Sequence, residues 1–429
     1  MSTTTAERPF VTDPDLDLAA RTFWARPYED REKAFARLRT ENPVSWHRPY
    51  ESTLLPPDED TPGFWAVTKF EDCREVSRNI ERFTSAKGIV MEDFPEIVQI
   101  AAHSFLAMDG DEHRQLRGIV STAFTPRNVR EIDAWIHEHA VDLVGRMIDH
   151  GEGDFCELFA KQLPGQIFAH FFGCEKDGEE QHILMDAAEK MLAWDDPECA
   201  QGRDALTTHA EEADRIQDVA LAAAERRRKD PADDLITWVV QAEFEGRQME
   251  DWEIASFFSL LGSAANDTTR HTLAHSVRLL SENPDQRAYL LEDLEGRAAG
   301  CVEEALRHAC PVMHFRRTAL VDTEVGGVPI KEGEKVVMWY CSGNRDEEVF
   351  PDSAKFDISR EPNRHLGFGA GGPHFCIGSA LGRQMVKSGL IEIYSRMPDF
   401  EMAGEPVFQV NNFMHGVQRL PVRWTPPKG

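Results

Sequence analysis

A cysteine in a glycine-rich turn is the residue of this chain best placed to do chemistry. The turn has the sequence HLGFGAGGPHFCIG from His365 to Gly378 and stands immediately ahead of a predicted helix. A helix start carries a partial positive charge that favours thiolate over thiol, and glycines let backbone N–H groups approach sulfur and a flat ligand. The turn therefore predicts that Cys376 acts as a thiolate ligand. An inert buried cysteine beside an ordinary loop is the alternative that the turn alone leaves open.

The same turn contains the spacing of a dinucleotide-binding fingerprint. Gly367, Gly369 and Gly372 give G-x-G-x-x-G, and the acid Glu392 follows about twenty residues later. That fingerprint requires a buried strand before it and a helix directly after it. Residues 363–365 are polar and Pro373 interrupts the run before the helix, so we reject a dinucleotide site here.

A second chemical pattern lies inside a long helical segment that begins near Asp251. Two small residues, Ala264 and Ala265, precede the acid Asp267 and the hydroxyl of Thr268. One face of this helix is apolar and ends in a hydroxyl, and it carries Phe257, Leu261, Ala264, Ala265 and Thr268. A threonine in a helix can bond back to the carbonyl four residues earlier, which opens space for a small molecule such as O2. Asp267 would be a proton source beside that space, although a core helix with a polar interruption has the same pattern.

A third pattern pairs two basic side chains. His113 and Arg117 stand four residues apart, so a hydrogen-bond donor and a fixed cation project from one helical face without attracting each other. An anion bound between them would explain the pair. Each residue could also be an ordinary solvated side chain.

The elements that must position these residues are mainly helical. Two strand-like segments, 44–47 and 64–69, flank a Pro/Asp-rich turn and predict an early hairpin. Helical spacing then dominates from about residue 113 to about residue 306, with breaks near Gly151, Asp230 and Asn283.

Strand signals return after Pro311. We predict strands over 317–325, 328–330 and 335–340, a Pro/Gly-rich meander up to Cys376, a helix over 379–396 and a final hairpin within 407–424. The expected fold is therefore mainly α with minor β.

The chain is long enough for one large domain. Its 429 residues, 41% of them hydrophobic, can bury a sizeable core, and neither a Gly/Ser-rich linker nor an internal repeat divides them. We expect a single domain over residues 1–429 with a flexible tail up to about residue 15.

Charge and cysteine usage exclude several classes of protein. The 75 acidic and 47 basic residues give a net charge of −28, which argues against nucleic acid or an anionic membrane surface as the main partner. The first ten residues lack the apolar core of a signal peptide, and no segment approaches the ~20 apolar residues of a membrane span, so we expect a cytoplasmic protein. The eight cysteines form no CxxC pair and no zinc-like cluster, so neither a disulfide framework nor structural zinc is expected.

The cysteine turn resembles the haem-ligand loop of the cytochrome P-450 family, which reads F-G-x-G-x-H-x-C-x-G. The matching residues are Phe368, Gly369, Gly371, His374, Cys376 and Gly378. One extra residue between Phe368 and Cys376 resembles the loop of a bacterial subgroup that oxidises sterol side chains and branched lipids. The other motifs follow in the family's order, so the resemblance covers nearly the whole chain. It implies the P-450 fold, with a small β-rich region, and a haem b cofactor.

The resemblance gives the motifs of the haem site their roles. Cys376 would be the axial ligand of the haem iron, and an iron-bound thiolate favours O–O cleavage. Residues that match propionate-binding positions are His113, Arg117, Arg317 and His374. Asp267 and Thr268 would deliver protons to dioxygen at the haem, and Ala265 stands where the family usually has glycine.

Glu304 and Arg307, three residues apart, match a structural motif of the family. Alone such a pair is common and stabilises a helix by only ~0.2–0.5 kcal/mol. The resemblance joins both residues to Arg360 in a buried ion network that would fix the meander behind the haem. Loss of one member of such a network costs about 3–5 kcal/mol, because it leaves a buried charge.

An apolar substrate pocket is expected beside the haem. Its predicted walls are Ile89, Val90, Met91, Phe257, Leu261, Val312, Phe315, Phe413 and Met414, each of which could also be ordinary core. The segment 412–416 again resembles the sterol and branched-lipid subgroup. We therefore expect a monooxygenase that hydroxylates a lipid, steroid or terpenoid with O2.

The electrons are expected from separate proteins, because no flavin or nicotinamide domain is visible in the sequence. A ferredoxin and a ferredoxin reductase are the predicted donors. A basic patch for docking the ferredoxin would contain Arg114, Arg127, Arg130, Arg383 and Lys387.

Other functions remain compatible with the sequence. A natural-product tailoring oxidase of the same family and a peroxide-driven peroxygenase are the enzymatic alternatives, and Asp267-Thr268 argues against the peroxygenase because peroxide chemistry needs no proton relay. A haem-bound carrier or sensor is the alternative without turnover.

Overall fold

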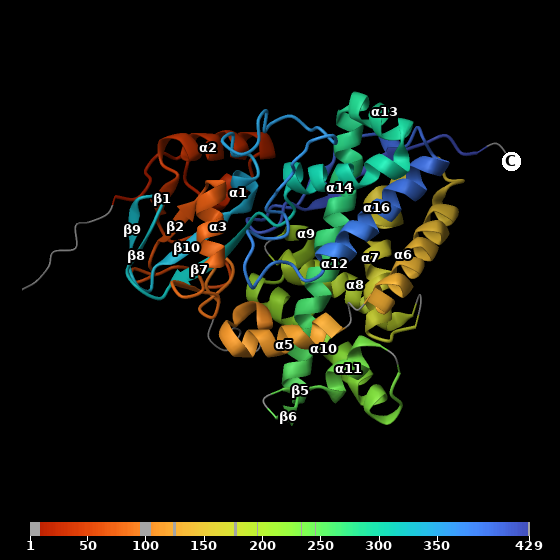
Figure 1. Ribbon diagram of the computed structural model, residues 1–429, viewed down its shortest axis with the longest axis horizontal. Helices are drawn as coiled ribbons and strands as arrows, with labels where there is room; N and C mark the ends of the chain where they lie inside the picture. Colours follow the sequence, from red (N-terminus) through yellow and green to blue (C-terminus); the bar gives the residue numbers. More distant parts are fainter. Residues whose placement is uncertain are drawn as a thin grey trace, which may run out of the picture.

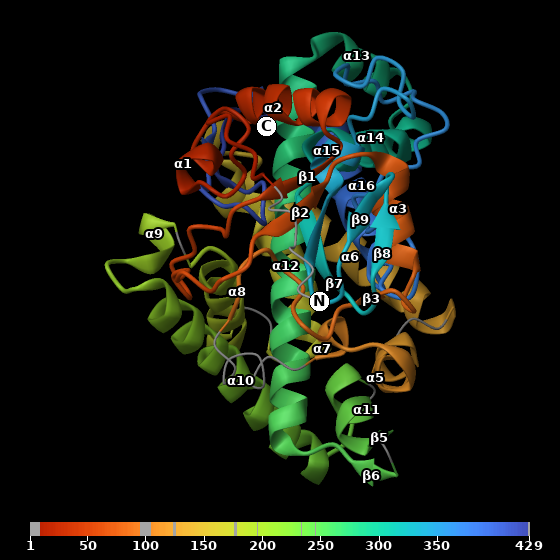
Figure 2. The same ribbon diagram turned by 90° about the vertical axis from the view of Figure 1, so that its left-hand side faces the viewer.

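One long helix organises the molecule. The computed structural model describes residues 9–427 except 95–103, 123–125, 176–177, 195, 233 and 245, and for residues 120, 122, 126–131 and 244 it describes the backbone only. Helix α12 (Asp251–Glu282) runs through the middle of the protein, as both ribbon views show (Figures 1 and 2). Its start is stabilised by a capping box in which the Glu250 and Glu253 side chains each accept a backbone N–H. It ends at Asn283, where Pro284 begins the next helix.

The other helices surround α12 or cover the sheet. The helices before α12 are α1 (Arg21–Trp24), α2 (Tyr28–Glu41), α3 (Phe70–Arg78), the 3-10 turn η1 (Phe105–Ala107), α5 (Gly110–Thr122), α6 (Pro126–Met147), the π-helical turn η2 (Cys156–Ala160), α7 (Gln162–Phe171), α8 (Glu179–Leu192), α9 (Pro197–Ala200), α10 (Ala205–Lys229) and α11 (Leu235–Gln241). Those after it are α13 (Pro284–Glu292), α14 (Leu294–Ala309), α15 (Tyr340–Gly343) and α16 (Ser379–Arg396).

The largest sheet has five strands in the order β1-β2-β10-β7-β3. These strands are β1 (Val44–His47), β2 (Phe64–Val67), β3 (Phe83–Thr84), β7 (His314–Ala319) and β10 (Lys335–Trp339). β10 pairs parallel with β2 and antiparallel with β7, with Val336 opposite Arg317. In Figure 1 this sheet and helices α2 and α3 form the left part of the molecule, and α6, α7 and α16 lie to the right of α12.

Four small sheets complete the β structure. Their strands are β4 (Glu152–Asp154), β5 (Glu243–Phe244), β6 (Arg247–Gln248), β8 (Thr323–Val325), β9 (Val328–Ile330), β11 (Glu401–Met402), β12 (Val407–Phe408), β13 (Val417–Arg419) and β14 (Pro421–Arg423). They pair as β11-β14-β4, β12-β13, β5-β6 and β8-β9.

The expected fold class, mainly α with a small β-rich region, is confirmed, and several predicted bounds match. Strands 44–47 and 328–330 and the helix 379–396 lie where the sequence predicts them. The early hairpin also forms, because β1 and β2 pair antiparallel.

Two strand predictions are wrong in detail. The predicted strand 317–325 is divided into β7 and β8, since a bend at residues 320–322 moves the chain from one sheet to another. The final hairpin is limited to β12 and β13, and β14 instead pairs with β11 and β4. Helices α2 and α3 were not predicted, since they precede the region from residue 113 in which helical spacing dominates.

Among the described residues, the buried apolar side chains form three large clusters, one of which packs α5, α7, α8, α10 and α11 around the first half of α12. A second joins α6, α12, α14 and α16, and the third fills the space between the five-stranded sheet and helices α1, α2 and α3. Within the described part of the chain, no helix is both long and apolar enough to cross a membrane.

A buried ion network connects the helical part to the meander that leads to Cys376. Arg307 donates to both carboxylate oxygens of Glu304, over 2.8 Å from Nε and 2.7 Å from Nη2, and both side chains are fully buried. Arg360 Nε lies 3.3 Å from Glu304 Oε2. Arg307 also donates to the carbonyl oxygens of Asn344, Ser353 and Lys355, over 3.0, 2.8 and 2.9 Å. The expected Glu304, Arg307 and Arg360 network is therefore present and holds residues 344–360 against α14.

We predict that Glu304→Gln lowers the free energy of unfolding by about 3–5 kcal/mol, because it leaves the Arg307 guanidinium buried without its carboxylate. Equilibrium denaturation in urea would measure the loss. The matched control is Glu71→Gln, which breaks an i,i+3 pair with Arg74 on the surface and should cost less than about 1 kcal/mol. Equal losses in the two variants would contradict a structural role for the buried network.

Candidate functional site

A chamber lies between α12, the cysteine turn and β7. It encloses about 1600 Å³ of space that protein atoms do not fill, part of it open to solvent. The sequence-predicted residues that line it are Leu261, Ala264, Ala265, Thr268, Val312, Phe315, Arg117, Arg317, Phe368, Gly369, His374, Cys376 and Gly378. The fold thus brings the cysteine turn, the acid-threonine helix and three of the predicted cations to one cavity.

Backbone geometry explains the glycines of the cysteine turn. Gly369, Gly371 and Gly372 have φ values of +96°, +90° and +84°, a region that side chains with a Cβ rarely adopt. A Cβ on Gly372 would also lie 2.8 Å from the Ser77 carbonyl oxygen. The Cys376 N–H donates to the Phe368 carbonyl over 2.9 Å, and this bond closes the turn immediately before α16.

The Cys376 thiol faces two opposing influences. Burial among protein atoms raises its pKa, whereas the Gly378 N–H and the cations Arg117 and Arg383 lower it. Burial is the largest effect, so the helix start does not by itself produce a thiolate. A metal ion bound in the chamber would produce the thiolate, because a thiol that coordinates a metal loses its proton.

The hydroxyl that the sequence places on α12 forms its expected local bond. Thr268 Oγ1 donates to the Ala264 carbonyl over 2.8 Å, and Thr272 Oγ1 donates to the Thr268 carbonyl over 2.7 Å. Ala264, Ala265, Thr268 and Thr272 all line the chamber. This wall therefore offers small side chains and hydroxyl groups along one face of the helix.

Asp267 lies beside this wall but not on it. Its buried carboxylate is 2.8 Å from Arg270 Nε, and it is not among the chamber-lining residues. Arg270 is in turn 2.9 Å from Glu189, and Lys161 is 3.0 Å from Glu189. Burial raises the pKa of Asp267 to about 6 despite the neighbouring arginine. A proton from Asp267 therefore needs a rotation of its side chain, or a water molecule, to reach the chamber.

The buried guanidinium of Arg317 at the chamber lacks an anionic partner among the residues that the structure describes. Arg317 is 4% exposed and donates to the Arg316 carbonyl over 2.8 Å, and no salt bridge joins it to any described residue. Burial lowers its pKa. The buried atoms His113 Nε2 and His374 Nδ1 have no hydrogen-bond partner among the described residues. The rings of these two histidines lie 4.4 Å apart. Such a set fits an anionic ligand, since buried cations require compensation.

His374 is oriented by Asp109, a residue that the sequence analysis missed. Asp109 Oδ1 lies 3.1 Å from His374 Nε2, while Oδ2 accepts hydrogen bonds from Thr84 Oγ1 over 2.5 Å and the Ser85 N–H over 2.8 Å. These contacts lower the pKa of Asp109 and fix the histidine ring through Nε2, so Nδ1 is the atom left for a ligand. In the sequence, Asp109 could have been identified as a site residue only by its position four residues before His113.

The residues predicted to form the substrate pocket do not all line the chamber. Leu261, Val312 and Phe315 line the chamber, whereas Phe257 lines a smaller neighbouring cavity. The remaining predictions, Ile89, Val90, Met91, Phe413 and Met414, are not among the lining residues. Val90, Phe413 and Met414 form a cluster behind Val312 and Phe315, and Ile89 packs against it. Met91 belongs to the core below the sheet.

Other lining residues were not predicted from the sequence. They include the apolar residues Phe105, Leu106, Phe168, Phe171, Leu235 and Leu260. All lie in helical or apolar segments, where a cavity wall and a packed core have the same hydrophobic pattern.

An arginine clamp fixes the loop 87–93, which carries three of the predicted pocket residues. Arg316 donates to the Lys87 carbonyl over 2.8 Å and pairs with Asp93 over 2.8 Å. The Arg316 backbone N–H donates to the Ile89 carbonyl over 2.7 Å. Because neighbouring residues of a strand point to opposite faces, Arg316 holds this loop while Arg317 lines the chamber.

These residues fit an iron porphyrin with two carboxylates. Cys376 would supply a sulfur ligand, and Arg317 together with His374 Nδ1 would supply a cation and a hydrogen-bonding atom for propionates. His113 does not itself line the chamber, but its ring lies beside that of His374. The remaining wall is apolar, and α12 adds a hydroxyl at Thr268.

Comparisons with known proteins agree with this geometry. The family model described as cytochrome P-450 matches residues 86–402. The chain is 38% identical over 421 residues to a methyl-branched lipid omega-hydroxylase of Mycobacterium tuberculosis, covering 97% of this chain and 96% of that protein. It is 34% identical over 424 residues to a steroid C26-monooxygenase of Rhodococcus jostii, covering 97% and 85%.

A solved structure extends the agreement to the fold. A cytochrome P-450 of Mycobacterium marinum in complex with pseudoionone superposes with a TM-score of 0.93 at 42% identity, covering 97% of this chain and 100% of that one. The family match and both relatives extend far beyond the cysteine turn. The chain therefore belongs to the cytochrome P-450 family and is a haem-dependent monooxygenase.

Proposed function

We propose that this enzyme hydroxylates an elongated hydrophobic molecule, a lipid, steroid or terpenoid, at a haem held by Cys376. The observation that carries the proposal is the thiol of Cys376 at an apolar chamber whose opposite wall presents Thr268. Haem bound there supplies activation of O2 by two electrons and insertion of one oxygen atom into a C–H bond. The names of the relatives, a lipid hydroxylase and a steroid monooxygenase, support this substrate class.

The chain's own residues hold the cofactor by complementary charge. Arg117, Arg317, His113 and His374 would bind the propionates, and Asp109 keeps the His374 ring in one orientation. Phe368, Gly369 and Gly378 line the chamber with Cys376, and the two glycines place no side chain where a porphyrin would lie. Buried Arg317 gains most from an anion, because no described carboxylate compensates its charge.

Proton delivery would use Thr268 as the terminal donor and Asp267 as the supply. Thr268 Oγ1 reaches the chamber while it donates to the Ala264 carbonyl, so its oxygen remains able to accept a hydrogen bond. Asp267, with a pKa of about 6, changes protonation near neutral pH and is suited to repeated proton transfer. The Arg270 and Glu189 pair holds the carboxylate in place between transfers.

A ferredoxin, reduced by a ferredoxin reductase, is the proposed electron donor, and the cytoplasm is the proposed location. The docking face would contain Arg383 and Lys387 on α16, beside the cysteine turn. Arg383 is paired with Glu303 over 2.6 Å, and Arg114 is paired with Asp111, so the patch is partly neutralised within the chain. The side chains of Arg127 and Arg130 lie outside the described residues.

The ligation of the haem and the substrate class are tested by absorption spectroscopy. The reduced carbonyl complex should show the red-shifted Soret band of a thiolate-bound haem, and neutral lipids, steroids or terpenoids should displace the sixth ligand of the ferric enzyme. Folded, haem-supplemented protein without that band would contradict the proposal. A response limited to polar ligands would contradict the substrate class.

We predict that Thr268→Ala retains haem but diverts most reducing equivalents to hydrogen peroxide, because the terminal proton donor is lost. Product formed per NAD(P)H consumed should fall at least fivefold, which corresponds to about 1 kcal/mol in partitioning. The matched control is Ser276→Ala, which removes a back-bonded hydroxyl of α12 that does not line the chamber. Unchanged coupling in Thr268→Ala would contradict the role of Thr268 in proton delivery.

We predict that Lys387→Glu slows ferredoxin-driven reduction of the haem several-fold at low ionic strength, because charge reversal repels an acidic partner. The difference from the wild type should shrink as salt screens the interaction. Stopped-flow reduction would measure the rate, with Lys229→Glu at the distant end of α10 as control. Identical salt dependence in both variants would exclude this docking face.

A further inference from the structure

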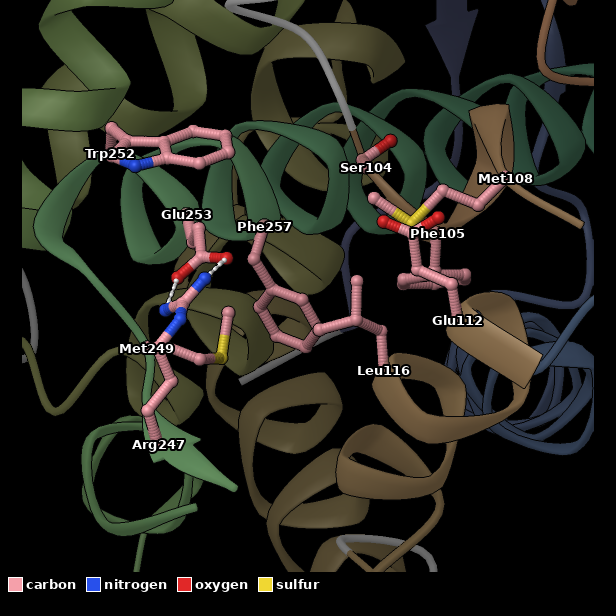
Figure 3. Close-up of a pocket in the computed structure, with 10 residues that line it drawn as sticks. All are labelled: Ser104, Phe105, Met108, Glu112, Leu116, Arg247, Met249, Trp252, Glu253 and Phe257. Carbon is pink, nitrogen blue, oxygen red and sulfur yellow. Dashed lines mark hydrogen bonds and ion pairs between the residues drawn. The ribbon is translucent and has the colours of Figure 1, made fainter. Parts of the chain in front are cut away.

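A second cavity lies beside the haem chamber at the start of α12 (Figure 3). It encloses about 590 Å³ of space that protein atoms do not fill, part of it open to solvent, against about 1600 Å³ for the haem chamber. Its walls come from the segment 104–108, from α5 and from the residues around the β6–α12 junction. The lining residues are Ser104, Phe105, Met108, Glu112, Leu116, Arg247, Met249, Trp252, Glu253 and Phe257.

The side chain of Phe105 stands between the two cavities. It lines both of them and is 5% exposed. Its ring lies 5.9 Å from that of Phe257, which lines the smaller cavity only. Leu261, one turn further along α12, lines the haem chamber. A rotation of Phe105 would therefore join the two spaces along one continuous apolar face of α12.

The distance along that face fits an elongated molecule. Phe257 and Thr268 are separated by eleven residues of helix, so the smaller cavity lies on the order of 16 Å from the catalytic hydroxyl. A ligand of that length with one end at Thr268 would place its other end in the smaller cavity. A short ligand would fill the haem chamber alone.

The charged residues at the smaller cavity disfavour an anion. Arg247 donates to both oxygens of Glu253, over 2.7 and 2.8 Å, as the dashed lines in Figure 3 show. Glu112 adds a second carboxylate to the lining, so acidic groups outnumber the guanidinium. A ligand carboxylate here would meet a net negative rim, whereas a neutral end would meet Leu116, Met249 and Phe257.

We infer that the smaller cavity is a second substrate subsite, which receives the far end of an elongated neutral lipid while its near end lies beside Thr268, where the haem would oxidise it. This inference rests on the proposed function. Phe105 divides the subsite from the haem chamber, and it rotates aside when a long ligand binds. The rim formed by Glu112 and the Glu253–Arg247 pair selects a neutral end over a carboxylate.

The length dependence is tested with Leu116→Trp, which fills the smaller cavity without reaching the haem chamber. Spectral titration should show binding of methyl palmitate weakened at least tenfold and binding of methyl octanoate changed less than twofold. The control Leu106→Trp fills the haem chamber and should weaken both esters. Met249→Phe provides a second filling variant, and the carbonyl spectrum verifies that each variant is folded.

The charge selection is tested with Glu253→Gln, which removes one carboxylate of the rim while glutamine preserves the capping box of α12. Palmitic acid should gain affinity at least threefold relative to methyl palmitate. An unchanged ratio would overturn the selection for a neutral end.

The two proposals fail in different ways. If methyl octanoate shifts the wild-type spectrum but Leu116→Trp binds methyl palmitate as the wild type does, the subsite is excluded and the proposed function stands. If neither ester shifts the spectrum of the wild-type enzyme, the proposed function itself is contradicted.

Discussion

The structure depends on a set of buried polar groups whose partners the protein itself does not provide. Arg317 has no carboxylate partner, and His113 Nε2 and His374 Nδ1 have no hydrogen-bond partner, among the residues that the structure describes. Burial of such groups without a partner carries a desolvation cost, and an anionic iron porphyrin bound beside them would offset it. Cofactor binding and folding are therefore linked, since a ligand that binds only the native state stabilises it.

Helix α12 lines the chamber with one face and is anchored by buried ion pairs on another face. The face that lines the cavity carries the small side chains of Ala264, Ala265 and Thr268. On another face, Asp267 and Arg270 are buried in an ion network with Glu189. The acid and the hydroxyl are adjacent in sequence, so a helix necessarily turns them apart by about 100°. This geometry explains why Asp267 lies beside the chamber rather than in it.

The sequence predicts the parts of this protein that depend on local chemistry. The cysteine turn, the Thr268 back-bond, the Glu304–Arg307 pair and the helix 379–396 follow from residue types at short spacing. The residues of the substrate wall cannot be predicted in this way. An apolar side chain such as Phe413 produces the same sequence pattern whether it faces a cavity or packs behind one. Asp109 was missed for a related reason, since its contact with His374 joins residues that are 265 apart in the chain.

The adjacent arginines of β7 connect the loop behind the chamber wall to the proposed cofactor site. Arg316 fixes the loop 87–93, and Arg317, on the other face of the same strand, lines the haem chamber. A change that displaces this loop would also displace the strand that carries Arg317, the proposed propionate-binding cation, so substitutions in the loop would tend to weaken haem binding as well. Directed evolution of this enzyme has more freedom at η1, where Phe105 and Leu106 shape the cavity walls without holding the cofactor.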